Sequence, residues 1–341
     1  MARQFASQRP WVRSRSFWTI VIILLCVAAF LYLLPLMFIW KEEIVLSQPP
    51  KPELFPVTVN PKTRTILEDP RVDAMLDTGD SKLSAAADNA QEALSMLASA
   101  ITATPLYQLI AASDARLVVV DPGYRKEQAA AVFGKILEWS PTEQKVFLQS
   151  SSTPPIADGF ISPGTYVVGF GATATNTRAL IDERFQRDIL SHYGTSTEAL
   201  VPLSQTLTIA SMLERETNDR NEMRIISGIM WNRIFAGMKL QIDATVQYAK
   251  ASKTPPPAVR NWWPPLTSKD KYIKSPYNTY QNAGLPPSPI ANPSVAAVLA
   301  ALNPKKTSCL FYFHDKAGGF HCSDTYKEHV ALLKRYYGQG K

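Results

Sequence analysis

The sequence predicts an α+β protein with a single N-terminal transmembrane helix, and three observations carry this prediction. Residues 17–40 contain no Asp, Glu, Lys, Arg or His. Further along, segments with apolar residues three and four apart predict helices. Short β-branched or extended runs, near 116–120 and 160–168, are bounded by turn residues and predict strands. The 341 residues leave room for two or three domains.

The apolar stretch 17–40 is long enough, at about 1.5 Å per helical residue, to cross a hydrocarbon core of roughly 30 Å. Four arginines precede it, whereas Lys41 after it is followed at once by two glutamates. The positive-inside rule therefore predicts a cytoplasmic tail over 1–16 and an extracytoplasmic location for everything after residue 41. A cleaved signal peptide is the alternative, but the stretch is longer than such peptides and no small-x-small site follows it.

The net charge of +7 is compatible with nucleic acid, anionic lipid or an anionic polymer as partner. Because no basic run of the nucleic-acid-binding type accompanies this charge, we expect no nucleic-acid partner. The four histidines lack the spacing of metal ligands, so the sequence predicts neither a metal site nor a cofactor.

Two cysteines, Cys309 and Cys322, follow the predicted span. A hairpin that turns at 317–319 would pair positions near 312 and 322 and would leave Cys309 about three residues out of register. We therefore expect free or marginal thiols.

The region 41–115 is predicted to be a linker and stalk. Residues 47–63 are rich in proline, which favours an extended chain. Residues 81–113 are rich in alanine with apolar positions at helical spacing, and a helix is expected there with a break near Pro105.

Residues 116–150 predict strand, tight turn, helix, turn and helix. Ser140 followed by Pro141 reads as an N-cap with proline at the first helical position. The order resembles the small LysM-like unit of certain cell-wall enzymes, which would bind glycan; an ordinary α/β spacer is the equal alternative. After a link at 150–155, we expect an extended segment over 160–168 and then a helix that begins at Asn176 or Thr177.

The stretch 207–248 has the layout of a catalytic carboxylate site. A helix that ends in Glu214 and Glu216 is followed by a second amphipathic helix, which stops at Gly237 before a segment containing Asp243. The two glutamates lie two residues apart, about 200° around a helix, so one helical face cannot present both. Periodicity favours Glu214 as the buried one, because it shares a stripe with Leu203, Leu207 and Ala210.

Several motifs here resemble a known family. Residues 210–217 read Ala-Ser-Met-Leu-Glu-Arg-Glu-Thr, 158–166 read Asp-Gly-Phe-Ile-Ser-Pro-Gly-Thr-Tyr, 277–280 read Tyr-Asn-Thr-Tyr, and 284–293 read Gly-Leu-Pro-Pro-Ser-Pro-Ile-Ala-Asn-Pro. In this order they resemble the motifs of the MltG/YceG family of endolytic murein transglycosylases. The departures are Gly164, Ala244 and Ser288 in place of Asp, Pro and Gly. The resemblance implies a catalytic domain over 155–341 made of helices packed on a short antiparallel sheet.

The resemblance also implies a role for one glutamate. In a lytic transglycosylase a single carboxyl group protonates the leaving oxygen and then, as carboxylate, takes a proton from the 6-hydroxyl of N-acetylmuramic acid. The second Glu of the family motif carries this role, so Glu216 is expected to be catalytic. Glu214 is a candidate substrate-binding residue, and its alternative is a buried carboxylate hydrogen-bonded to backbone or to Arg233.

Other side chains near these helices are candidates for binding sugar. As alternatives, Arg233 could cap its helix, Asp243 could start a turn, and the proline-rich loop after the tyrosines could serve stability alone. The remaining substrate-binding candidates are Asn232, Arg233, Gln241, Asp243, Tyr277, Asn278 and Tyr280.

Two functions follow. The first is an enzyme in the bacterial cytoplasmic membrane that cuts nascent peptidoglycan strands outside the membrane, beside the peptidoglycan synthases as possible partners. The second is an inactive anchored scaffold that binds cell-wall polymer or division proteins. Because Glu214, Glu216 and Asp243 are all present, the sequence favours the enzyme.

Overall fold

The structure is a computed structural model, and it describes residues 27, 53–72, 115–149, 156–169, 171–255 and 261–338. The chain divides into two compact units, 1–52 and 53–341, and all elements considered below belong to the second. Among the described residues, no helix has both the length and the apolar character needed to cross a membrane. The predicted span 17–40, apart from Val27, and the predicted stalk helix 81–113 lie outside the described residues.

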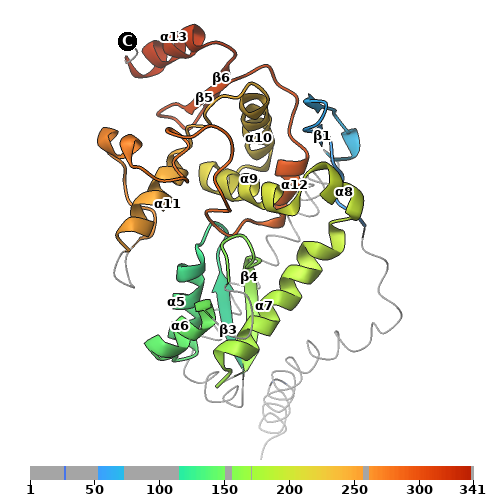
Figure 1. Cartoon of the computed structure of the whole chain (residues 1–341), viewed down its shortest axis with the longest axis vertical. Helices are drawn as coiled ribbons and strands as arrows, with labels where there is room; N and C mark the ends of the chain where they lie inside the picture. Colours follow the sequence, from blue (N-terminus) through green and yellow to red (C-terminus); the bar gives the residue numbers. More distant parts are fainter. Residues whose placement is uncertain are drawn as a thin grey trace, which may run out of the picture. The chain divides into compact units, whose positions relative to one another are not determined.

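The first part of the second unit has the order strand, helix, helix, strand (Figure 1). Strand β3 (Ala115–Val120) pairs antiparallel with β4 (Gly164–Gly169) along its full length. Helices α5 (Lys126–Ile136) and α6 (Pro141–Gln149) lie between them in the chain and share one core with both strands. Strand β4, which the sequence assigned to the next domain, is therefore the second strand of this unit.

Local caps explain where two of these helices begin. The Ser140 hydroxyl accepts from the Glu143 amide at 3.3 Å while the Glu143 carboxylate accepts from the Ser140 amide at 2.7 Å, so the predicted cap of α6 is confirmed. Helix α7 (Ala174–Asp188) begins two residues before the predicted start. Its N-cap is Thr173, whose hydroxyl accepts from the Asn176 amide, so Asn176 already lies in the first turn.

The second part is a cluster of helices around α9 (Leu203–Glu216). The helices that surround or precede it are separated by connections that contain glycine, proline or aspartate. They are α8 (Thr195–Leu200), α10 (Arg220–Phe235), α11 (Asp243–Lys253) and α12 (Val295–Leu302), with the 3-10 turns η1 (Leu190–His192) and η2 (Ser268–Tyr272). A small pair of strands, β1 (Val59–Asn60) and β2 (Thr65–Ile66), packs against the same core.

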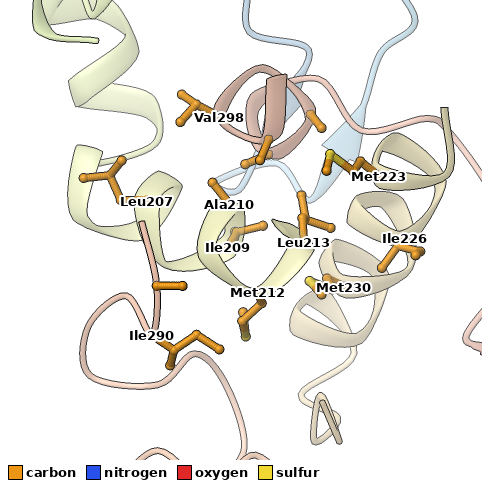
Figure 2. Packing of buried hydrophobic residues seen from close by; sticks show 14 of the residues in the cluster. Leu207, Ile209, Ala210, Met212, Leu213, Met223, Ile226, Met230, Ile290 and Val298 are labelled. Atoms are coloured by element: carbon orange, nitrogen blue, oxygen red, sulfur yellow. The ribbon is translucent and has the colours of Figure 1, made fainter. Parts of the chain in front are cut away.

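Helix α9 is buried on every side over residues 206–214. Figure 2 shows its apolar side chains between α10 on one side and α12 and the loop at Ile290 on the others. A helix with no face in solvent lies inside the core of its domain. The sequence prediction of helices packed on a sheet is therefore only partly right, because the core of this region is helix on helix.

The predicted short sheet is a hairpin, β5 (Phe311–His314) with β6 (Phe320–Ser323), followed by α13 (Tyr326–Tyr337). Its register matches the prediction, since Tyr312 lies opposite Cys322. The expectation of free thiols is nevertheless wrong, because Cys309 and Cys322 form a disulfide with their Cα atoms 5.8 Å apart. The chain leaves the ladder before Leu310, so Cys309 does not continue the strand and reaches Cys322 from outside it.

Helix α10 approaches the segment after α12 very closely at Gly228. A β-carbon at this position would lie 2.2 Å from the carbonyl oxygen of Lys305, nearer than real contacts allow. The same segment is held by a hydrogen bond from the Lys305 amide to the Arg224 carbonyl, 2.9 Å long. Gly228 is therefore needed for packing, despite the cost of a glycine inside a helix.

The disulfide predicts a stability effect. It closes a loop with a sequence separation of 13, for which the chain-entropy estimate is about 3 kcal/mol. Reductant should therefore lower the free energy of unfolding in guanidinium by about that amount. The double variant Cys309→Ser/Cys322→Ser should be less stable by a similar amount and should not respond to reductant. If reductant destabilises both proteins equally, the effect does not come from this bond.

Gly228→Ala gives a test in which helix propensity and packing predict opposite signs. Propensity alone predicts a gain of about 1 kcal/mol, whereas the backbone clash predicts a loss of about 1–3 kcal/mol. We expect the loss, measured by chemical unfolding. Ser227→Ala is the control, because the Ser227 hydroxyl is buried with no hydrogen-bond partner among the described residues, and its removal should be neutral or stabilising.

Candidate active site

The end of α9 directs its two glutamates to different neighbours. The Tyr312 hydroxyl on β5 donates to Glu216 Oε2 at 2.7 Å. None of the described residues donates to the other oxygen, Oε1. Desolvation of the carboxyl raises the pKa of Glu216, the charge of Asp243 raises it further, and Tyr312, His314 and Arg215 oppose the shift. Glu216 therefore keeps its proton to a higher pH than an ordinary glutamic acid, and one of its oxygens has no donor among the described residues.

Glu214, by contrast, is bound within the fold. Its Oε2 accepts two hydrogen bonds from Ser294, one from the backbone amide at 2.8 Å and one from the hydroxyl at 2.7 Å. Ser294 is the N-cap of α12, so the carboxylate lies at the positive end of that helix. This arrangement matches the alternative reading of Glu214 as a buried carboxylate bound to backbone, except that its side-chain partner is Ser294 rather than Arg233.

Asp243 and Tyr280 form a second carboxylate–phenol pair near Glu216. The Tyr280 hydroxyl donates to Asp243 Oδ1 at 2.6 Å, and burial raises the Tyr280 pKa, with the nearby Asp243 and Glu216 adding to the effect. Asp243 is exposed and is the first residue of α11. Gln241 before it is also exposed and has a φ of 56°, a left-handed conformation that is uncommon for a residue other than glycine and that often marks functional sites.

Asn232 and Arg233, two other candidates, hold the hairpin in place. The Asn232 side-chain amide donates to the carbonyl oxygens of Thr307 and Cys309, at 2.7 and 3.2 Å. Arg233 donates from Nε to the Leu310 carbonyl at 2.6 Å, and its Nη1 donates to the carbonyls of residues 239 and 240. Arg233 is buried, and desolvation lowers its pKa. The side chains of Asn232 and Arg233 therefore donate to backbone carbonyls of the protein itself.

The Tyr-Asn-Thr-Tyr segment is also tied to its surroundings. Asn278 is fully buried and donates to the carbonyls of Lys271 and Ile273 while its Oδ1 accepts from the Tyr280 amide. The Tyr277 hydroxyl is 2.7 Å from Ser288 Oγ, and its ring packs on that of Tyr248. Asn278 therefore fixes the position of Tyr280, and Tyr277 is a partly buried wall of the same loop.

Sequence reasoning missed three residues that matter here: Tyr312, His314 and Ser294. Tyr312 and His314 lie two apart on a strand, so their side chains share one face. Tyr312 contacts Glu216, and His314 Nε2 lies 3.0 Å from the Glu222 carboxylate. The alternation of polar-tipped aromatics in this strand was a visible signal, but nothing in the sequence showed which helix the face would meet. Ser294 carried no signal beyond that of a helix cap.

The site holds no metal-ligand set: across the described ranges, no three His, Cys, Asp or Glu side chains come together in a way that would bind a metal ion. Two hollows, about 140 Å³ between α6 and α7 and about 240 Å³ between β3 and the start of α12, are not lined by Glu216.

The chain is similar in sequence to known proteins. A 182-residue stretch is 30% identical to an endolytic murein transglycosylase of Bacillus subtilis, covering 52% of this chain and 48% of the relative. A 195-residue stretch is 28% identical to an endolytic murein transglycosylase of Streptococcus pneumoniae, covering 56% of this chain and 33% of the relative. The chain thus spans half or less of the length of these curated relatives.

A solved structure and a family profile agree with these matches. The crystal structure of a YceG-like protein from Listeria monocytogenes aligns with a TM-score of 0.53 at 25% identity, over 63% of this chain and 75% of that protein. The profile of the YceG-like family matches residues 55–335, which includes the strand–helix–helix–strand unit, the helical cluster and the hairpin. On this match over most of its length, the chain belongs to the YceG-like family.

Proposed function

We propose that this protein is a membrane-anchored endolytic peptidoglycan lytic transglycosylase in which Glu216 acts first as acid and then as base. It would cleave the bond between N-acetylmuramic acid and N-acetylglucosamine in nascent glycan strands. The observation that carries the proposal is the Glu216 carboxyl group, whose pKa is raised by desolvation and whose Oε1 has no protein partner among the described residues. The names of the relatives from B. subtilis and S. pneumoniae support the choice of substrate.

The proposed reaction balances without water. Glu216 gives its proton to the glycosidic oxygen, and the bond from that oxygen to C1 of the muramic acid breaks with its electron pair leaving on the oxygen. The 6-hydroxyl of the same sugar bonds to C1 while Glu216, now a carboxylate, takes the hydroxyl proton. The products are one free 4-hydroxyl end and one 1,6-anhydro end, and Glu216 is again protonated.

Asp243 is suited to assist this reaction by its charge. Positive charge develops on the sugar as the glycosidic bond breaks, and a carboxylate nearby stabilises it. The same negative charge raises the pKa of Glu216, which keeps more of the acid protonated. Gln241, two residues before Asp243 in the chain, is also exposed and has a left-handed backbone, so its side chain is available to bind a sugar amide.

The location is proposed from the sequence and from one feature of the fold. Residues 17–40 would anchor the protein in the bacterial cytoplasmic membrane, with the catalytic domain outside and the synthases as possible partners. The Cys309–Cys322 disulfide supports the extracytoplasmic side, because such bonds persist in oxidising compartments. Glycan binding by the LysM-like unit stays a prediction.

The first experiment tests whether the protein is an enzyme with Glu216 as its acid or an inactive scaffold. The full chain in mild detergent is incubated with purified glycan strands, and the products are identified by mass spectrometry. Glu216→Gln should reduce the yield of anhydro-ended fragments by about 100-fold or more, since it cannot give a proton. Glu214→Gln removes a charge from the start of α12 and should mainly lower stability, with anhydro products still formed.

The outcomes decide between the functions. Reducing ends in place of anhydro ends would indicate hydrolysis. A folded wild type that binds glycan and yields no fragments would contradict the enzyme and favour the inactive scaffold.

Asp243→Asn should change the pH dependence in a defined direction. Loss of the negative charge lowers the pKa of Glu216, so the acid loses its proton at a lower pH. The alkaline limb of kcat/KM, which reports the acid in the free enzyme, should therefore move to lower pH. Lys239→Gln, near the site but outside the charges that shift Glu216, is the control. An alkaline limb that stays in place in Asp243→Asn would refute the coupling.

A further inference from the structure

We propose that Tyr312 is the positioning residue for Glu216: by holding Oε2, it leaves Oε1 as the one oxygen that meets the substrate. Oε1 would then deliver the proton to the leaving sugar and receive the proton of the 6-hydroxyl. This inference rests on the proposed function and adds a residue and an oxygen assignment to it.

The hydrogen bond is the direct evidence. The Tyr312 hydroxyl lies 2.7 Å from Glu216 Oε2, a short distance for a phenol and a carboxyl oxygen. Burial raises the pKa of Tyr312 well above its usual value, and the Glu216 charge adds to the shift, so the phenol remains a proton donor at any pH of interest. The carbonyl oxygen of a carboxylic acid accepts hydrogen bonds better than its hydroxyl oxygen does, so donation from Tyr312 favours Oε2 as the carbonyl oxygen and leaves the acidic proton on Oε1.

The strand that carries Tyr312 is held firmly across the turn between α9 and α10. Its neighbour His314 lies 3.0 Å from Glu222 Oε2, which also accepts from the Thr217 hydroxyl at 2.8 Å. Thr217 directly follows Glu216. Tyr312 and His314 lie on the same face of β5. Tyr312 binds α9 through Glu216, and His314 binds α10 through Glu222, so the strand is attached to both helices.

The base of the hairpin is fixed as well. Asn232 and Arg233 bind the carbonyls of Cys309 and Leu310, and the disulfide joins Cys309 to Cys322, the residue opposite Tyr312. A phenol on a strand anchored in this way keeps its direction when substrate enters. Tyr312 is therefore preorganised to hold the Glu216 carboxyl in one orientation.

The effect on the reaction follows from the two states of Glu216. When the acid has given up its proton, Tyr312 donates to the resulting carboxylate, and hydrogen bonds to charged groups are stronger than those to neutral ones. Tyr312 thus stabilises the state that exists between the two proton transfers. Its hydrogen bond also lowers the pKa of Glu216, against the larger effect of desolvation.

The charged and polar groups that shift the pKa of Glu216 lie on three elements, α9, α11 and β5. Desolvation and Asp243 of α11 raise its pKa, whereas Tyr312 and His314 of β5 and Arg215 of α9 lower it. The Glu216 charge also raises the pKa of Tyr280, which donates a hydrogen bond to Asp243. A change at Tyr312 alone therefore has a predictable sign.

Tyr312→Phe is the test, with two readouts on the full chain. The kcat for glycan cleavage should fall about 10- to 100-fold with little change in KM, since a hydrogen bond to a charged state is lost. At the same time the pKa of Glu216, followed by ¹³C NMR of labelled glutamate and assigned by loss of the signal in Glu216→Gln, should rise. A structural role alone would lower kcat without raising this pKa.

The matched control is Tyr337→Phe. The Tyr337 hydroxyl donates to the backbone carbonyl of His314 on the same strand and makes no bond to Glu216, so its loss should leave the Glu216 pKa in place. If Tyr312→Phe fails to fold, 3-fluorotyrosine incorporated at position 312 keeps the ring and strengthens the donor. It should shift the Glu216 pKa in the opposite direction, downward.

The outcomes distinguish this proposal from the proposed function. An unchanged Glu216 pKa in Tyr312→Phe or in the fluorotyrosine protein would overturn the positioning role, even with cleavage intact. Absence of cleavage by the wild type would refute the transglycosylase, while the NMR titration would still report whether Tyr312 holds Glu216.

Discussion

The burial of α9 on all sides is the constraint on which the rest of the fold depends. Over residues 206–214 the helix has no face in solvent, so each polar group on it needs a partner inside the protein. Ser211 accepts from the Ile290 amide at 3.0 Å, and Glu214 accepts twice from Ser294. The loop before α12 is therefore attached to α9 by the hydrogen bonds of Ser211 and Glu214, two buried polar residues that need partners inside the protein.

The end of this helix then explains why two nearby glutamates differ so much. Glu214 still lies within the buried part, where a carboxylate must be hydrogen-bonded, and the N-terminus of α12 supplies the donors. Glu216 lies at the last helical position, on the opposite side, against the hairpin. One donor there is not enough to offset desolvation, so its pKa is raised. The geometry of a single helix end thus separates a carboxylate that is hydrogen-bonded to the N-terminus of α12 from one whose pKa is raised by desolvation.

How much the sequence predicted depends on whether a feature is local. The cap at Ser140, the burial of Glu214 and the register of Tyr312 opposite Cys322 follow from residues close in the chain, and they were predicted correctly, whereas α9 is buried on every side and not along one stripe. The partners of the two glutamates are separated from them by 80 and 96 residues, so no periodicity could reveal them. The disulfide was missed for a related reason: the ladder was extrapolated to Cys309, where the chain had already left it.

The residues that lie near Glu216 in the sequence are not the ones that contact its carboxyl group. Asn232 and Arg233 follow α9 closely in the chain, yet their donors bind carbonyls at the base of the hairpin. Through the hairpin they act on Tyr312, which contacts Glu216. A change at Arg233 would therefore reach Glu216 by moving the strand, whereas a change at Tyr312 would alter the hydrogen bond itself. Arg233 is nearer to Glu216 along the chain, whereas Tyr312 is the one in contact with it. Only the contact predicts which of the two residues changes the pKa of Glu216 directly.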